Sequence, residues 1–258
     1  MRLRSRRSAV VLAAVLAIIG LVIAVRPSAS SVQTQSARYG QTSTVGALFT
    51  LTSADQLGTH FCTASVVDSP AGDLVVTAAH CMNGRTPSEI AFVPGYSHGL
   101  APFGVWTVSR IIEDQAWLSS ADPDDDFAFL VVHQTGANGG VQALTGGEAV
   151  GIGVPAGQTV KVAGYPDDKD AMISCENTAT SFSPTQYQFD CGGFTGGTSG
   201  SPLLADAGTP GGATVIGVIG GYQGGGDTPS VSYAAKFSSS LSALYKTALD
   251  EAGSLQGR

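Results

Sequence analysis

One glycine-rich segment of the sequence could carry covalent chemistry at a serine. It reads Gly196-Gly197-Thr198-Ser199-Gly200-Ser201-Pro202. A serine hydroxyl becomes a useful nucleophile when a base takes its proton and hydrogen-bond donors stabilise the negative oxygen formed after attack. Glycines before Ser199 allow the backbone to turn so that the N–H groups of Gly197 and Ser199 point at one spot, an oxyanion hole. The alternative is a plain Gly/Ser loop, since residues 224–226 form another glycine run.

The base for such a serine has to be a histidine, and the chain has four: His60, His80, His98 and His133. His80 follows the apolar run 74–79 and precedes Cys81. A strand end and a disulfide would fix its position, as a well-aimed base requires. A core histidine bonded to backbone is the alternative for this residue. Because the other three histidines lack this combination of cues, His80 is the candidate base.

A buried carboxylate should orient the imidazole and stabilise its protonated form. Asp126 closes the acidic run 122–126 and opens the apolar run 127–132, so of these acids it lies nearest to buried surroundings. The alternating acids of the run could instead bind calcium, although the run lacks the glycine and glutamate that an EF-hand loop needs at its sixth and twelfth positions. Asp126 is therefore the candidate orienting acid.

The order of these residues along the chain separates classes of hydrolase. In α/β-hydrolases the histidine follows the nucleophile, whereas here every histidine precedes Ser199. A subtilisin order could be composed from Asp68 or Asp73 with His80, but that architecture needs a βαβ periodicity that the sequence lacks. The order that remains is His80, Asp126, Ser199.

The composition indicates a globular β protein that could position these groups. The chain has 258 residues, of which 43% are hydrophobic, 13% are charged and 34 are glycine, which excludes a disordered chain and disfavours a coiled coil. From Ser31 onward 20 acidic residues face 8 basic ones, which argues against a nucleic-acid partner. Short β-rich runs separated by turn residues predict strands near 45–51, 74–79, 106–112, 127–133, 158–163, 187–190 and 213–220.

These strands predict an all-β protein with an antiparallel sandwich or barrel in two halves, residues 45–134 and 148–237. The glycine-rich stretch 135–147 is interpreted as the linker between them. In the last segment, 238–258, apolar residues recur at helical spacing and predict a helix that docks on its own domain. We expect a monomer. The residues on the apolar face of that helix are Leu241, Leu244, Tyr245, Ala248 and Leu249.

The N-terminus predicts export. Four arginines lead into the apolar run 9–25, so residues 1–30 are interpreted as a signal peptide or a membrane anchor that leaves the main domain outside the cytoplasm. Residues 31–44 would then be a linker or propeptide remnant. An even number of cysteines in the exported part predicts two disulfides, with three connectivities open and the pairs nearest in sequence favoured. No zinc-type spacing occurs, so we expect no metal site. The cysteines are Cys62, Cys81, Cys175 and Cys191.

Three motifs in this order resemble the chymotrypsin/trypsin-like serine peptidases, in their secreted bacterial form. They are Thr77-Ala78-Ala79-His80-Cys81, Asp126-Phe127-Ala128-Phe129-Leu130 and Gly197-Thr198-Ser199-Gly200-Ser201-Pro202. His60-Phe61-Cys62 resembles the segment whose cysteine bridges to the one after the histidine. The resemblance implies two six-stranded antiparallel β-barrels with the site between them, a C-terminal α-helix, and hydrolysis of protein or peptide substrates through an acyl-enzyme without a cofactor. An esterase, or a binding module without activity, is the alternative.

The sequence departs from the digestive members of that family before the nucleophile. Those enzymes carry an aspartate there that pairs with a freed N-terminus, but this chain has Thr198 and no Ile-Val-Gly-Gly motif. The resemblance places a substrate side-chain pocket around residues 193–196, 218–222 and 230–233. Because Gly193 stands where trypsins carry aspartate, we expect a small or medium uncharged side chain there, with Asp227 as the feature that argues against it. The substrate-binding candidates are Gly193, Phe194, Gly220, Gly221 and Tyr222.

Overall fold

The computed structural model describes residues 43–52, 56–137, 139–209 and 212–256. The predicted signal peptide or anchor lies outside the described residues, as does nearly all of the predicted segment 31–44. Within the described part of the chain, no helix combines the length and the apolar character needed to cross a membrane.

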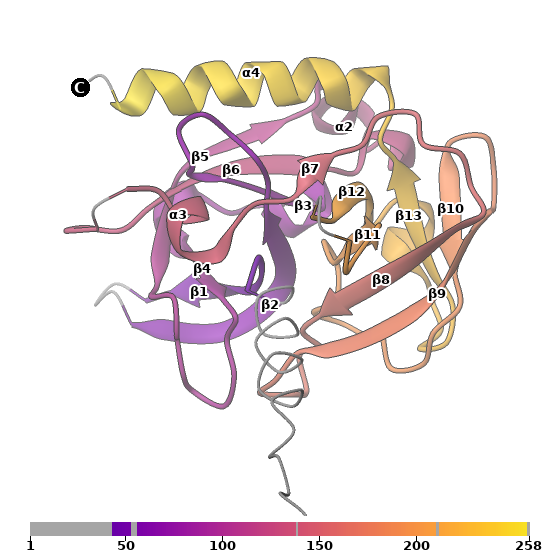
Figure 1. Cartoon of the computed structure of the whole chain (residues 1–258), viewed down its shortest axis with the longest axis horizontal. Helices are drawn as coiled ribbons and strands as arrows, with labels where there is room; N and C mark the ends of the chain where they lie inside the picture. Colours follow the sequence, from indigo (N-terminus) through magenta and orange to yellow (C-terminus); the bar gives the residue numbers. More distant parts are fainter. Residues whose placement is uncertain (1–42, 53–55, 138, 210–211, 257–258) are drawn as a thin grey trace, which may run out of the picture. The chain divides into compact units, whose positions relative to one another are not determined.

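Six antiparallel strands from the first half of the chain close into a barrel in the order β1-β2-β3-β6-β5-β4 (Figure 1). Their inward side chains are mostly valine, leucine, isoleucine and phenylalanine, which suit a half-buried pleated surface and fill the barrel interior. The strands are β1 (Val45–Leu51), β2 (Leu57–Val66), β3 (Leu74–Thr77), β4 (Ile90–Pro94), β5 (Trp106–Glu113) and β6 (Ala128–His133).

Six strands from the second half form a second antiparallel barrel in the order β11-β8-β9-β10-β13-β12, closed by pairing between β11 and β12. The two-residue strand β7 (Ala149–Val150) adds to β12 in parallel at the edge of this sheet. The predicted all-β class with two six-stranded barrels is confirmed. The strands are β8 (Gln158–Gly164), β9 (Ile173–Ser181), β10 (Gln186–Phe189), β11 (Pro202–Ala205), β12 (Thr214–Ile219) and β13 (Ser232–Lys236).

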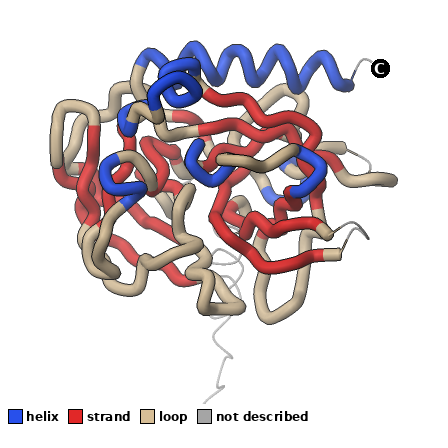
Figure 2. Tube along the Cα trace, turned by 180° about the vertical axis from the view of Figure 1, so that it is seen from behind, coloured by secondary structure: helices blue, strands red, loops and turns tan. Residues whose placement is uncertain are grey.

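The predicted C-terminal helix is α4 (Ser239–Gln256). It follows the second barrel in sequence yet packs on β5 and β6 of the first, as the view from behind in Figure 2 also shows. Leu241, Leu244, Ala248 and Ala252 are buried on its inner face, and the ring of Tyr245 lies 5.3 Å from that of Phe129.

Short helical turns connect the strands. The α-helical turns are α2 (Gln115–Ser120) and α3 (Gln142–Thr145), and the 3₁₀ turns are η1 (Ala79–Met82), η2 (Pro87–Glu89), η3 (Pro123–Asp125) and η4 (Tyr222–Gly225). Two of these turns carry or adjoin candidate catalytic residues: η1 contains His80, and η3 ends directly before Asp126.

Both disulfides join the cysteines that are nearest in sequence, which confirms the predicted pairs. Cys62 on β2 is bonded to Cys81 in η1, and Cys175 on β9 is bonded to Cys191 just after β10. Each bridge therefore stays within one barrel. The first one ties the turn that contains His80 to the neighbouring strand β2.

Candidate active site

His80 and Asp126 lie together because they leave adjacent strands at the same end of the first barrel. Thr77, the last residue of β3, pairs with Ala128, the first residue of β6. His80 lies three residues after that pair, in η1, and Asp126 lies two residues before it, after η3. Strand pairing thus brings two residues that are 46 positions apart in sequence to one site.

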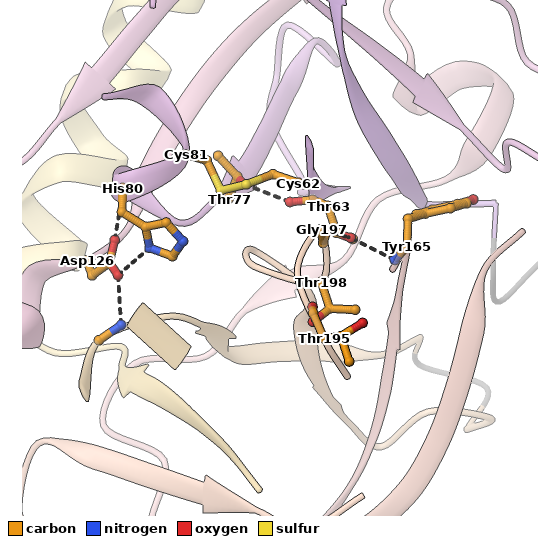
Figure 3. The surroundings of a disulfide bond; sticks show 11 residues. Cys62, Thr63, Thr77, His80, Cys81, Asp126, Tyr165, Thr195, Gly197 and Thr198 are labelled. Carbon is orange, nitrogen blue, oxygen red and sulfur yellow. Dashed lines mark hydrogen bonds and ion pairs between the residues drawn. A yellow bond between two sulfur atoms is a disulfide. The ribbon is translucent and has the colours of Figure 1, made fainter. Parts of the chain in front are cut away.

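The carboxylate of Asp126 accepts three N–H groups (Figure 3). The ring Nδ1–H of His80 donates to Oδ2 at 2.7 Å, and the backbone N–H of His80 donates to Oδ1 at 2.8 Å. The third donor is the backbone N–H of Gly221, 2.7 Å from Oδ2. With Asp126 only 1% exposed, these bonds hold the imidazole in the tautomer whose Nε2 carries the lone pair.

The donor from Gly221 reaches Asp126 from the second barrel, so the carboxylate is shared between the two halves of the chain. The neighbouring Gly220 explains the close approach, since a Cβ on it would lie 2.8 Å from Oδ2 of Asp126. Gly221 itself has a φ of +77°, which favours glycine. Both residues were predicted to bind substrate, and the structure places them against Asp126.

The serine loop between β10 and β11 lies against the first barrel at two points. The backbone N–H of Thr63 on β2 donates to the carbonyl oxygen of Ser199 at 2.8 Å. A Cβ on Gly200 would lie 2.2 Å from Oγ1 of Thr77, at the end of the strand that leads to His80. Ser199 is therefore brought to the segment that carries His80, while its own Oγ makes no hydrogen bond to any residue in the described part of the chain.

Gly197 has a backbone conformation and surroundings that only glycine fits. Its φ is +87°, and a Cβ there would lie 2.5 Å from the carbonyl oxygen of Tyr165 and 2.6 Å from the amide nitrogen of Asp167. Among the described residues, the N–H groups of Gly197 and Ser199 have no hydrogen-bond acceptor. Two donors therefore remain available beside the serine hydroxyl.

Thr198, between those two donors, is buried and holds the turn. Its N–H and its hydroxyl both donate to the carbonyl oxygen of Thr195, at 3.1 Å and 2.6 Å. Thr198 makes these local bonds at the position that corresponds to the aspartate of the digestive enzymes. The turn is thus stabilised within the segment 195–198 itself.

A cavity of about 270 Å³ adjoins Ser199. Of the predicted substrate-binding residues, Phe194 lines it, whereas Gly193, Gly220, Gly221 and Tyr222 do not belong to its lining. Tyr222 instead contacts the rings of Phe182 and Tyr233, at centroid distances of 4.8 Å and 5.0 Å. The lining comprises Phe194, Thr195, Gly196, Thr198, Ser199, Ile219, Gly224, Gly225, Gly226, Asp227, Thr228, Pro229 and Ser232.

Thr63 is a site residue that the sequence analysis missed. In addition to the bond to Ser199, its Oγ1 donates to the carbonyl oxygen of Gly197 at 3.1 Å and accepts the N–H of Tyr165 at 2.9 Å. Figure 3 shows the bond from Tyr165 to Thr63 near the disulfide. A threonine in a strand is common because of its β-branched side chain, so nothing in the sequence marked it.

The surroundings of His80 contain sulfur and further acids. A ring nitrogen of His80 lies within 4.8 Å of the sulfur atoms of Cys62 and Cys81, but these sulfurs form a disulfide and so are not thiolate metal ligands.

In the acidic run 122–126, Asp124 accepts a hydrogen bond from Gln186, and Asp125 accepts one from Ser240. These acids thus join the first barrel to β10 and to the start of α4, and burial raises the pKa of Asp125.

Together, the two-barrel fold and a buried acid–histidine pair beside a glycine-rich serine loop define the class of serine endopeptidases. Residues 58–232 match the trypsin-like peptidase domain, and the chain belongs to that family. The comparison with curated proteins found no match.

Solved structures agree with this assignment. The protease Anisep from Arthrobacter nicotinovorans is 26% identical with a TM-score of 0.68, over 82% of this chain and 97% of that one. The thermostable serine protease AL20 from an extremophilic microorganism is 26% identical with a TM-score of 0.67, over 82% and 99%. A Glu endopeptidase at 16% identity and a TM-score of 0.62, over 81% and 91%, shares the fold.

Proposed function

We propose that Ser199, His80 and Asp126 are the catalytic triad of an exported endopeptidase. The observation that supports this best is the buried carboxylate of Asp126, which holds Nδ1 of His80 at 2.7 Å and leaves Nε2 as the proton acceptor. The side chain of His80 is 24% exposed, so a substrate can reach its free nitrogen. The contact between Ser199 Oγ and His80 Nε2 is part of the proposal.

In the first half of the reaction, Oγ of Ser199 attacks the carbonyl carbon of the peptide bond while Nε2 of His80 takes the hydroxyl proton. The C=O π electrons move to the oxygen, and the N–H groups of Gly197 and Ser199 stabilise that charge. When the carbonyl re-forms, the C–N bond breaks and Nε2 gives its proton to the leaving amine. An acyl-enzyme on Ser199 remains.

In the second half, a water molecule replaces the amine. Nε2 of His80 takes a proton from this water as its oxygen attacks the ester carbon, and the same N–H groups bind the new oxyanion. The intermediate then collapses, Ser199 recovers its proton from His80, and the acid product leaves. Protons and electron pairs balance over the cycle, so these steps require no cofactor.

The two disulfides and the N-terminal run of arginines and apolar residues support a location outside the cytoplasm. Disulfides form and persist mainly in oxidising compartments. Residues 1–30 then act as a signal peptide or an anchor, and the enzyme works as a monomer on protein or peptide substrates. The N-terminal sequence of protein recovered from the medium, compared with that of a membrane fraction, distinguishes these two forms.

A serine-directed fluorophosphonate tests the triad. It should label the wild-type protein once per chain, and Ser199→Ala should abolish both the label and peptide hydrolysis. Ser201→Ala is the matched control, because this neighbouring serine is fully buried and its Oγ has no partner among the described residues. Asp126→Asn should lower kcat by about 10⁴-fold with the fold unchanged.

The outcomes separate the candidate functions. Labelling with peptide hydrolysis supports the endopeptidase, whereas labelling with hydrolysis of esters alone indicates an esterase. Absence of both in a folded wild-type protein indicates a binding module. Equal labelling of wild type and Ser199→Ala would contradict the assignment of the nucleophile.

A further inference from the structure

The cavity beside Ser199 has one charged wall. This inference builds on the proposed function, because it concerns the side chain that precedes the bond cut at Ser199. Since Ser199 itself lines the cavity, a side chain next to the attacked carbonyl would enter it. Its lining comes from the serine loop, from Ile219 and from the loop 224–232.

Asp227 is the ionisable residue of this lining, and none of the described lining residues is lysine, arginine or histidine. Its carboxylate forms no ion pair or hydrogen bond with any described residue. Two lysines of the second barrel are engaged elsewhere: Lys236 donates to Ser181, Ser183 and Pro184, and Lys169 pairs with Asp168. The Asp227 carboxylate is therefore available to pair with a cationic ligand in the cavity.

The backbone around Asp227 does little to favour an anion. The N–H groups of Gly224 and Gly226 donate to the carbonyls of Gly221 and Gln223 within the loop. The N–H of Gly193 donates to the carbonyl of Pro229, which ties the loop to the serine segment. These donors are therefore not directed at an acidic side chain in the cavity, and the charge of Asp227 would repel one.

The apolar part of the lining suits the stem of a long cationic side chain. Phe194 and Ile219 are 5% and 3% exposed and form an apolar wall. Lysine and arginine pack their methylene groups on such surfaces while the charged end stays near water. Asp227 lies at an exposed position, so its carboxylate meets that end near the solvent.

We infer that this cavity binds the side chain of lysine or arginine at the residue whose carbonyl Ser199 attacks, with Asp227 as counter-ion. The expectation of an uncharged side chain rested on Gly193, which does not line the cavity. The acidic residue of this cavity is instead Asp227, which lies 34 residues after Gly193 in the sequence. The excess of acidic over basic residues from Ser31 onward also favours cationic peptides by attraction at a distance.

Peptides that differ only at this residue test the inference. We expect kcat/KM for lysine to exceed that for norleucine, its uncharged analogue, by about 5- to 20-fold at low salt, and to exceed that for glutamate by more. High salt should reduce the preference, because Asp227 is exposed. Asp227→Asn should bring the lysine-to-norleucine ratio to within about twofold of unity while cleavage of the norleucine peptide persists.

Asp206→Asn is the matched control, because it removes the same charge from an exposed turn outside the cavity and should keep the ratio. A measurement on the wild type alone covers the case in which Asp227→Asn fails to fold: butylammonium should slow fluorophosphonate labelling of Ser199 more than butanol does. A labelled, active enzyme with a ratio near one, or with a ratio unchanged by Asp227→Asn, overturns this inference and leaves the triad standing. Absence of all labelling and hydrolysis overturns the proposed function and this inference together.

Discussion

The backbone N–H of Thr63 donates a hydrogen bond to the carbonyl oxygen of Ser199, 2.8 Å away. Thr63 lies on β2 of the first barrel and Ser199 lies on a loop of the second, so this bond crosses between the halves of the molecule. The Thr63 hydroxyl extends the connection to Gly197 and Tyr165. The buried residue Thr63 thus fixes the position of the loop that carries Ser199 relative to the first barrel.

Replacing Thr63 by valine should impair catalysis more than substrate binding. Valine keeps the shape but removes the bonds from Oγ1 to Gly197 and from Tyr165 to Oγ1, at a cost of about 1–3 kcal/mol in stability. We expect kcat to fall about 10-fold or more with a smaller change in KM. Thr63→Ser keeps the hydroxyl and should restore most of the rate, and a valine variant with wild-type kcat would contradict the positioning role.

Gly197→Ala should disable the oxyanion hole. The added Cβ would meet the Tyr165 carbonyl and the Asp167 amide, so the peptide at Gly197 has to rotate and its N–H turns away. We expect kcat to fall by about 10²- to 10³-fold. Gly192→Ala is the control, because nothing lies within 4 Å of a Cβ there. Steady-state kinetics on one peptide checks both variants, and equal losses in the two would argue against the assignment.

Thr198→Ala should retain most of the activity. The variant loses the hydroxyl bond to Thr195, but the N–H of residue 198 still donates to the same carbonyl and holds the turn. We expect kcat/KM within about 5-fold of wild type, corresponding to about 1 kcal/mol for one neutral hydrogen bond. A collapse of turnover would mean that the Thr198 hydroxyl orders the oxyanion hole as an ion pair does in relatives.

Asp73→Asn should stabilise the protein at neutral pH and have little effect in acid. Asp73 is 8% exposed, its Oδ1 has no partner among the described residues, and burial raises its pKa. The folded state therefore binds the proton more tightly than the unfolded chain. Stability from this group is present below the ordinary aspartate pKa of about 3.9 and is lost as the pH rises through the raised value.

Thermal unfolding at two pH values measures this effect. At pH 7 the asparagine variant should melt about 2–4 °C higher, which corresponds to roughly 1 kcal/mol, and near pH 3 the difference should vanish. The exposed Asp250→Asn is the control and should shift Tm little at either pH. A lower Tm for Asp73→Asn at pH 7 would show that its carboxylate is stabilised by an interaction.

The sequence predicted best where local chemistry decided the outcome. The strand 45–51 and both disulfide pairs were predicted as they occur, because a short run of mostly apolar residues and a short cysteine spacing act locally. The predicted strand 74–79 ends at Thr77 instead, since the chain turns into η1 there. Strands β2, β4, β9, β11 and β13 were not among the predicted ones. The residues of β9 are mostly exposed and polar, and pairing with β8 holds it in the sheet.

The parts that could not be predicted depend on contacts between distant segments. Gly221 was expected at the substrate, but the approach of η4 to the first barrel directs its N–H at Asp126. The roles of Thr63 and Asp227 likewise depend on which loop each faces, and neither residue type is unusual in its own segment. Three ordered motifs predicted the candidate catalytic residues, whereas the bonds that support them depend on the folded chain.

The packing of α4 on the first barrel affects what happens when the backbone is cleaved between the two barrels. Because this helix follows the second barrel in sequence and packs on the first, a cut between β6 and β7 would leave two fragments that remain bound to each other. Such a nicked enzyme should elute as one particle, because the helix adds to the bonds that already cross between the barrels at Asp126 and Thr63. If other copies of the enzyme cleave the chain there, the packing of α4 on the first barrel would help to keep the cleaved protein in one piece.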